Sequence, residues 1–291
     1  MHSDILSRPT SEGRVTVCVG ALCCNAAGKK SKAVVVASDR MVTVAGMTEF
    51  EPETPKVIRL TERMVALSAG DALKGAAVIQ ATRSALPADN PTVQAVSEEA
   101  SRHYAVLRAR QIEAQFFAPR GISMGEFYRG LQAHLLPQLA ATLDAQVSQF
   151  DYGVELLIAG ADDSGAHLFY VGNPGGQAWD LTPIAFGAIG SGALHATQSL
   201  IGFKHTSAKA LDETIFEVYL SKKRGEAAPG VGNETDLLVI TEDGCVTATE
   251  ADLKELDAIV EEYQKPAGDI LKKRLEKLKL AKGGHDAASN A

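Results

Sequence analysis

A hydroxyl, a carboxylate and an amine lie at the ends of three short stretches near the start of the chain. Thr16 opens an alternating stretch, Asp39 ends an apolar run rich in β-branched residues, and Lys56 opens a third stretch. A threonine hydroxyl needs a base, and the α-amine of an N-terminal threonine can be that base because it titrates near neutrality. A nearby ammonium lowers the pKa of the hydroxyl, and a carboxylate can hold the ammonium in place. Together the three residue types suit nucleophilic hydrolysis, although each is also ordinary where it stands.

The pattern around these residues predicts a sheet. In residues 16–22 the side chains alternate between two faces, with Val17, Val19 and Ala21 on one of them, and residues 33–38 are mostly apolar. Both stretches are predicted to be strands, and residues 56–60 are predicted to form a third short strand. The polar segment 25–32 is expected to be a hairpin loop. Because the three polar residues stand at strand ends, pairing of the strands can bring them together.

Short motifs from Thr16 onwards follow one another in a characteristic order and spacing. They are Thr16-Val-Cys-Val-Gly, Ala37-Ser-Asp39-Arg, Lys56, Leu67-Ser-Ala-Gly70-Asp, Glu155-Leu-Leu-Ile-Ala-Gly, Gly187-Ala-Ile-Gly-Ser191-Gly and Thr235-Asp-Leu-Leu-Val-Ile. In these motifs the chain resembles the proteasome β-subunit group of N-terminal nucleophile hydrolases, and it looks closest to the small bacterial branches, the heat-shock peptidase subunit and the ancestral β-subunit. The resemblance covers roughly residues 16–250.

The resemblance implies a fold, an activity and an assembly. The implied fold is α+β, a four-layer αββα sandwich, and the implied enzyme is a threonine-type endopeptidase that acts on peptides or unfolded proteins within a homo-oligomeric ring. No cofactor or metal is implied, and an ATPase unfoldase is a possible partner. By resemblance Thr16 is the nucleophile, Asp39 and Lys56 assist it, and Ser191 lies beside the threonine amine. A backbone N–H near Gly70 would stabilise the oxyanion.

Residues 1–15 stand in the way of this chemistry, because Thr16 has no free amine while they are attached. Three explanations are open. The segment is a propeptide that Thr16 removes by attacking the carbonyl of Val15, or translation starts at position 15, or nothing is removed and the subunit is inert. The family usually has a small glycine where this chain has Val15, which would crowd self-cleavage.

Composition narrows the classes of function. The chain has 291 residues and a net charge of −7, which fits one large domain with an appendage. No basic stripe precedes the tail, so nucleic-acid binding is not expected. No apolar run suggests a membrane span or a signal peptide, and we expect a cytoplasmic protein.

The cysteines and histidines give weak signals. The four cysteines lack metal-ligand spacing and are expected to be buried and reduced; Cys23 as a nucleophile has no basic neighbour in sequence. His103 and His134 fall on predicted helices without nearby ligands, so a metal site is not expected.

Helices are predicted on both sides of the central strands. Asp71 can cap a first helix, a second runs from residue 92 to about 112, and Ser123 with Glu126 forms a capping box that opens a helix towards residue 143. Ser191 can alternatively be a helix N-cap. Segment 102–145 is longer than in the compact relatives. The tail, residues 251–291, is expected to contain two helices separated by residues 266–268, and to dock on the domain or contact another subunit.

One loop departs from the family pattern. Family members often carry an Asp and a Ser there, but residues 225–234 align with neither, and Asp236 is expected to open a strand rather than join the chemistry. Two rival functions therefore stay open: a non-catalytic, ring-forming scaffold of the same fold, and a small-amide hydrolase of the wider superfamily.

Overall fold

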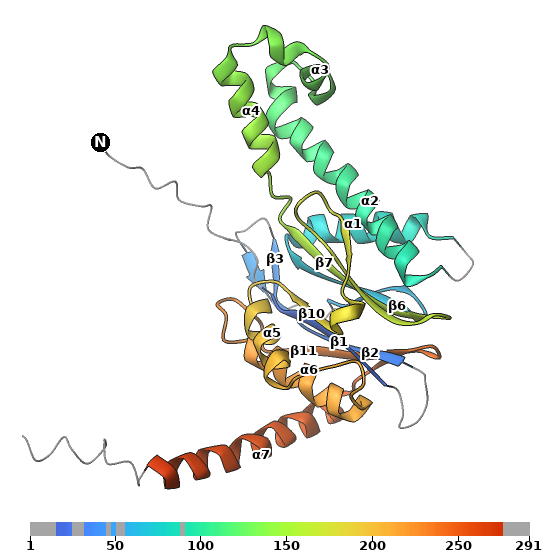
Figure 1. The fold of residues 1–291 in the computed structure, drawn as a ribbon, viewed down its shortest axis with the longest axis vertical. Coiled ribbons are helices and arrows are strands. Elements are labelled where there is room, and N and C mark those ends of the chain that lie inside the picture. The colour runs from blue at the N-terminus through green and yellow to red at the C-terminus, as the bar shows by residue number, and fades with distance from the viewer. Residues whose placement is uncertain (1–15, 25–31, 45–47, 51–55, 88–90, 276–291) are drawn as a thin grey trace, which may run out of the picture. The chain divides into compact units, whose positions relative to one another are not determined.

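The chain divides into two compact units, the first ending at Thr247 and the second beginning at Ala248. The computed structural model describes residues 16–24, 32–44, 48–50, 56–87 and 91–275 (Figure 1). The predicted loops at 25–31 and 51–55 and the segment 1–15 lie outside the described residues.

The first sheet of the larger unit holds the stretch that begins at Thr16. Its five strands run in the order β10-β1-β2-β11-β12, and every neighbouring pair is antiparallel. The predicted hairpin pairing is confirmed, with Cys18 opposite Ser38. Both faces of β1 are buried, which explains why its alternation is between apolar and small residues rather than apolar and charged ones. The strands are β1 (Cys18–Cys24), β2 (Lys32–Asp39), β10 (Phe186–Ile189), β11 (Thr235–Thr241) and β12 (Gly244–Thr247).

The second sheet is also antiparallel and has the order β5-β6-β7-β8-β9. Its centre is the predicted hairpin, in which Asp162 pairs with Gly165 across the turn. A separate pair, β3 (Val42–Val44) and β4 (Thr48–Phe50), lies between β2 and β5 in the sequence. The strands of the second sheet are β5 (Ile58–Thr61), β6 (Met64–Gly70), β7 (Val154–Asp162), β8 (Gly165–Val171) and β9 (Ala178–Asp180).

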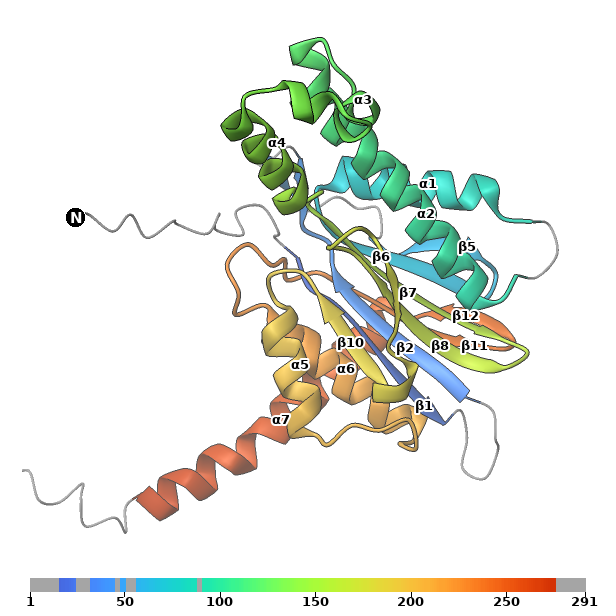
Figure 2. The ribbon, with the colours of Figure 1, turned by 45° about the horizontal axis from the view of Figure 1, so that its top comes forward.

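The two sheets pack face to face, and helices cover their outer faces (Figure 2). Apolar side chains of β1 and β2 meet those of β6, β7 and β8 in one buried core, which includes Leu22, Val36, Leu67, Leu157 and Leu168. The helices α1 (Ala72–Ala85) and α2 (Val93–Ile112) pack on the second sheet. The helices α5 (Ala193–Gly202) and α6 (Leu211–Gly225) pack on the first. The prediction of an α+β fold is confirmed.

Helix ends are set by side chains that the sequence had singled out. Asp71 accepts hydrogen bonds from the backbone N–H groups of Leu73 and Lys74 and caps α1. Ser123 and Glu126 form the predicted capping box of α3 (Met124–Tyr128). The expectation that this helix continues towards residue 143 is wrong, because α3 ends at Tyr128.

Two backbone features explain the early end of α3. Gly130 adopts a φ of 134°, which a helix cannot include, and a proline starts the next helix, α4 (Pro137–Gln149). With the end of α2, these helices extend from the sheets as an arm that has a small core of its own (Figure 1). Short segments of π and 3₁₀ helix join them at Glu113–Phe117, Ala118–Arg120 and Leu131–His134.

The smaller unit contains one long helix, α7 (Glu250–Leu275). The predicted interruption at residues 266–268 is wrong, because the backbone stays helical past Pro266. A proline removes one helical hydrogen bond and bends the chain, but it does not oblige the helix to end. None of the helices in the described part of the chain combines the length and apolar character needed to cross a membrane.

Candidate active site

The site lies where β1 begins and β2 ends. Thr16 stands two residues before β1, and Asp39 is the last residue of β2. The Asp39 N–H donates to the Val17 carbonyl at 3.1 Å, so the antiparallel ladder itself places the two residues side by side. Lys56 stands two residues before β5 in the other sheet and reaches across the gap between the sheets. The register therefore brings together three residues that the sequence separates.

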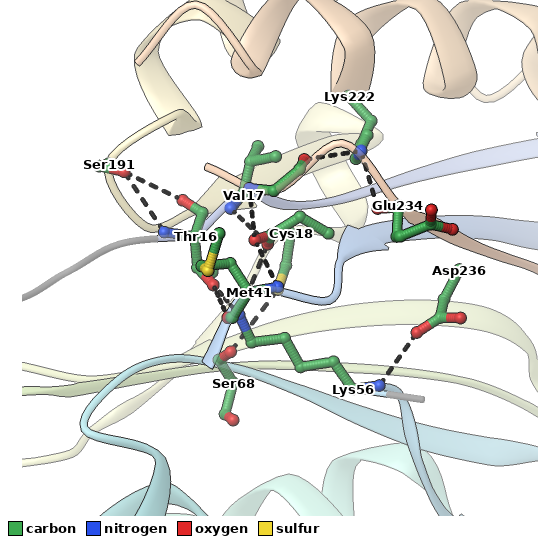
Figure 3. Close-up of polar contacts among 12 residues, drawn as sticks. Thr16, Val17, Cys18, Met41, Lys56, Ser68, Ser191, Lys222, Glu234 and Asp236 are labelled. Carbon is green, nitrogen blue, oxygen red and sulfur yellow. Dashed lines mark hydrogen bonds and ion pairs between the residues drawn. The ribbon is translucent and has the colours of Figure 1, made fainter. Parts of the chain in front are cut away.

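The ammonium of Lys56 is the centre of the cluster (Figure 3). Its Nζ donates to Thr16 Oγ1 and to the Met41 carbonyl, and lies 3.5 Å from Asp39 Oδ1. The side chain is 11% exposed and that of Asp39 is fully buried. A charge pair shielded from water in this way interacts more strongly than one at the surface. The arrangement holds a positive charge directly against the threonine hydroxyl.

The Asp39 carboxylate is fixed by the backbone as well as by Lys56. Oδ1 accepts from the Val17 N–H at 2.9 Å, and Oδ2 accepts from the Met41 and Gly232 N–H groups at 3.1 Å each. A buried carboxylate with these donors keeps its position without relying on the lysine alone. Asp39 can thus orient Lys56.

Ser191 contacts Thr16 from the turn between β10 and α5. The Thr16 N–H donates to Ser191 Oγ at 3.3 Å, and the serine hydroxyl lies 3.3 Å from the Thr16 carbonyl oxygen. Gly192, not Ser191, is the N-cap residue of α5, and that cap makes no side-chain hydrogen bond. The alternative role of Ser191 as a helix cap is therefore wrong. Its hydroxyl accepts a hydrogen bond from the nitrogen of residue 16 and can orient that nitrogen.

The close approach of this turn depends on Gly190. Its φ is 90°, and a Cβ there would lie 2.3 Å from the Thr16 carbonyl oxygen. Its N–H donates to Glu155 Oε2 at 3.0 Å, and the other carboxylate oxygen of Glu155 accepts from the Tyr170 hydroxyl at 3.2 Å. Glu155, a residue of β7, thereby links the turn that carries Ser191 to the second sheet. Sequence reasoning missed this role; a carboxylate opening an otherwise apolar strand was the available signal.

Asp236 lies at the start of β11, as expected, and it also contacts the backbone of the site. It is the second residue of β11, and its Oδ2 accepts from the backbone N–H of Lys56 at 3.0 Å. Its Oδ1 accepts from Arg40 Nε at 2.8 Å. Asp236 is almost fully buried and fixes the backbone from which Lys56 projects. The pairing of β11 with β2 places it there, and no local motif in the sequence predicts it.

Gly70 lies at the same end of the stacked sheets. The Cys18 thiol faces the Ser68 carbonyl at 3.7 Å, which brings the end of β6 close to the start of β1. Gly70 has a φ of 96°, and a Cβ there would collide with the Gly153 carbonyl oxygen at 2.1 Å. Among the hydrogen bonds of the described residues, none joins Gly70 to Thr16. Its role in binding an oxyanion stays a prediction.

Cys18 and Cys23, the two buried cysteines, are poor nucleophiles. Burial raises the pKa of the Cys18 thiol far above its ordinary value, and burial also raises that of Cys23 to about 11. Cys23 lies near the other end of β1 from Thr16. The described residues contain no group of three or more His, Cys, Asp or Glu side chains that can hold a metal ion; His103 and His134 lie on α2 and on a short 3₁₀ helix.

The geometry thus joins four of the five residues predicted from the sequence. A hydroxyl contacts an ammonium, the ammonium lies beside a buried carboxylate, and the backbone nitrogen of the same threonine contacts a serine hydroxyl. An ammonium in this position favours the ionised form of the hydroxyl, and a free amine on residue 16 would supply the base that takes its proton. A scan against protein-family models and a search of curated proteins found no match to this chain.

Proposed function

We propose that the chain is an N-terminal nucleophile hydrolase of the proteasome β-subunit type, with Thr16 as the nucleophile. The contact of Lys56 Nζ with Thr16 Oγ1, beside Asp39, carries the proposal. Two stacked antiparallel sheets with helices outside support it, since the proposed family's sandwich has this layer order. The reaction class is hydrolysis of a peptide bond through an acyl-enzyme.

The proposed cycle uses atoms that already adjoin. Once residue 16 is N-terminal, its amine takes the Oγ1 proton while Oγ1 attacks the substrate carbonyl, and Lys56 stabilises the developing alkoxide. The resulting α-ammonium gives its proton to the leaving amine as the C–N bond breaks. Water, deprotonated by the amine, then attacks the ester and regenerates the Thr16 hydroxyl. Ser191 keeps the amine oriented throughout.

The oxyanion donor and the assembly are also part of the proposal, although neither is drawn from the contacts around Thr16. The N–H of Gly70 is assigned to the oxyanion, because it lies at the same end of the sheets as Thr16. The subunit is proposed to work in a homo-oligomeric ring on peptides or unfolded proteins, with an ATPase unfoldase as a possible partner.

The cycle requires that residues 1–15 be absent, because Thr16 otherwise carries an amide instead of a basic amine. The test is N-terminal sequencing of the purified protein together with hydrolysis of fluorogenic peptides. We expect a chain that begins at Thr16 and cleaves peptides. Peptide cleavage by protein that still carries residue 1 on every chain contradicts the mechanism.

The same assay separates the rival functions. A trimmed protein that hydrolyses small amides but no peptide would be an amide hydrolase. An untrimmed protein that assembles and hydrolyses neither substrate would be a scaffold.

A further inference from the structure

The loop between α6 and β11 forms one wall of the carboxylate site. Within this loop, residues 226–234, the Gly232 N–H donates to Asp39 Oδ2 at 3.1 Å. The loop is rich in glycine and alanine and has few side chains that can fix its own shape. Backbone hydrogen bonds hold the loop as far as Val231, whose N–H donates to the Ala228 carbonyl at 3.3 Å, and Gly232 is the next residue.

Lys222 holds the next three residues of the loop. Its side chain is fully buried near the end of α6, and its Nζ points into the loop (Figure 3). The ammonium donates to the carbonyl oxygens of Gly232 at 3.1 Å, Asn233 at 3.1 Å and Glu234 at 2.9 Å. These three consecutive carbonyls turn towards one cation, so the path of the loop follows the position of the lysine.

The electrostatic setting explains why an ammonium is tolerated there. Burial lowers the pKa of Lys222, while its hydrogen bond to Glu226 opposes this change, as does the nearby Asp39 carboxylate. Glu226 Oε1 lies 2.6 Å from Nζ. A buried lysine without such partners would be costly. The ammonium of Lys222 donates to three loop carbonyls and to the Glu226 carboxylate, so its charge is balanced and its hydrogen bonds are made.

We infer that Lys222 is a positioning residue that acts on the nucleophile through the loop. It holds Gly232 against Asp39, Asp39 orients Lys56, and Lys56 contacts Thr16. The effect on catalysis rests on the proposed function, whereas the effect on the loop does not. The inference also explains how residues 225–234 can position Asp39 without the Asp and Ser that the family usually has in this segment.

Lys223 provides a matched control. It is the next residue on the same helix, its Nζ lies 3.3 Å from the same Glu226 oxygen, and its side chain is 28% exposed. Its ion pair uses the same carboxylate but is more open to water, where such pairs contribute little. A Lys223→Met variant therefore removes a neighbouring charge of the same kind and leaves the three carbonyl contacts of Lys222 in place.

The experiment compares Lys222→Met with Lys223→Met in the full chain. Amide hydrogen exchange by mass spectrometry follows the segment containing Gly232, and peptide hydrolysis gives kcat and KM. We expect Lys222→Met to lose protection at this segment and to lower kcat about ten- to a hundred-fold with KM little changed, because small displacements in a catalytic site have effects of this size. Lys223→Met should match the wild type in both measurements.

A second variant covers the case in which Lys222→Met fails to fold. Lys222→Gln keeps an amide that can donate to two carbonyls, so its protection and its kcat should fall between those of the wild type and the methionine variant. Wild-type protection of the Gly232 segment in a folded Lys222 variant overturns the inference. Lost protection with unchanged kcat overturns the link to catalysis. An inactive wild type whose loop still depends on Lys222 refutes the peptidase proposal alone, because exchange needs no turnover.

Discussion

Replacing Lys56 by methionine should separate catalysis from stability. Methionine has nearly the same length and can occupy the same path, but it carries no charge and donates no hydrogen bond. In the structure the ammonium contacts the nucleophile, a backbone carbonyl and a carboxylate. The change therefore removes the interactions of Nζ and little of the packing.

The size of the catalytic effect follows from those contacts. At the 3.5 Å separation of Nζ from Asp39 Oδ1, an effective dielectric constant of about 20 gives an attraction of roughly 5 kcal/mol before desolvation. An alkoxide at Thr16 Oγ1 would lie in hydrogen-bond contact with the same ammonium. Removing one donor to a developing oxyanion costs about 3–4 kcal/mol, or a hundred- to a thousand-fold in kcat. We expect Lys56→Met to lose at least that factor.

The loss of stability should be much smaller. A buried charge left without partners costs about 3–5 kcal/mol. Asp39 without Lys56 still accepts hydrogen bonds from the backbone N–H groups of Val17, Met41 and Gly232. We therefore expect a loss of only about 1–2 kcal/mol in the free energy of unfolding. Chemical denaturation measures the stability, and hydrolysis of a fluorogenic peptide measures kcat.

Lys209→Met is the control for loss of a buried ion pair. Lys209 is 19% exposed and forms an ion pair with Glu217, which is almost fully buried. The backbone carbonyl of Lys209 accepts a hydrogen bond from the N–H of Cys24, at the end of β1 that is remote from Thr16. This variant should lose a comparable amount of stability and keep its kcat. The reasoning about Lys56 is refuted if Lys56→Met retains wild-type kcat, or if both variants lose activity in proportion to stability.

Three further predictions test neighbouring groups. Thr16→Ala should abolish turnover and leave the assembly intact by size-exclusion chromatography; residual peptide hydrolysis would point to another nucleophile. Glu155→Ala should lower kcat about ten-fold, because the N–H of Gly190 loses its acceptor and the turn that carries Ser191 is less well positioned. Glu155→Gln still offers an oxygen acceptor and should keep most of the wild-type kcat. Because burial raises the pKa of Cys23 to about 11, its thiolate is scarce below that pH; iodoacetamide at pH 7.5 should alkylate half-buried Cys24 first and leave peptide hydrolysis unchanged.

Those parts of the fold that local patterns determine were predictable from the sequence. The alternation after Thr16 and the apolar run before Asp39 predict a hairpin, and the register confirms it. Capping by Asp71 and by Ser123 likewise depends on residues within one helical turn. The extent of the helices was less predictable. The helix opened by Ser123 is short because of a glycine with positive φ, and α7 is longer than expected because a proline is tolerated inside it.

The residues that the sequence did not predict share a different cause. Glu155, Asp236 and Lys222 each make hydrogen bonds to backbone groups outside their own strand or helix. Any residue can supply the backbone group that such a side chain contacts, and the two do not stand at a fixed spacing in the sequence. A sequence motif therefore does not identify the side chain. Two of the three left a trace in the sequence: Glu155 stands near the start of an otherwise apolar strand, and Lys222 stands four residues after buried Val218 on the core face of an amphipathic helix. A lysine on such a face has to find buried acceptors, and the only acceptors that every loop offers are its carbonyl groups. Charged residues on predicted core faces are therefore the signals from which positioning residues of this kind can be sought in a sequence, whereas contacts between distant strands, such as that of Asp236 with Lys56, need the fold.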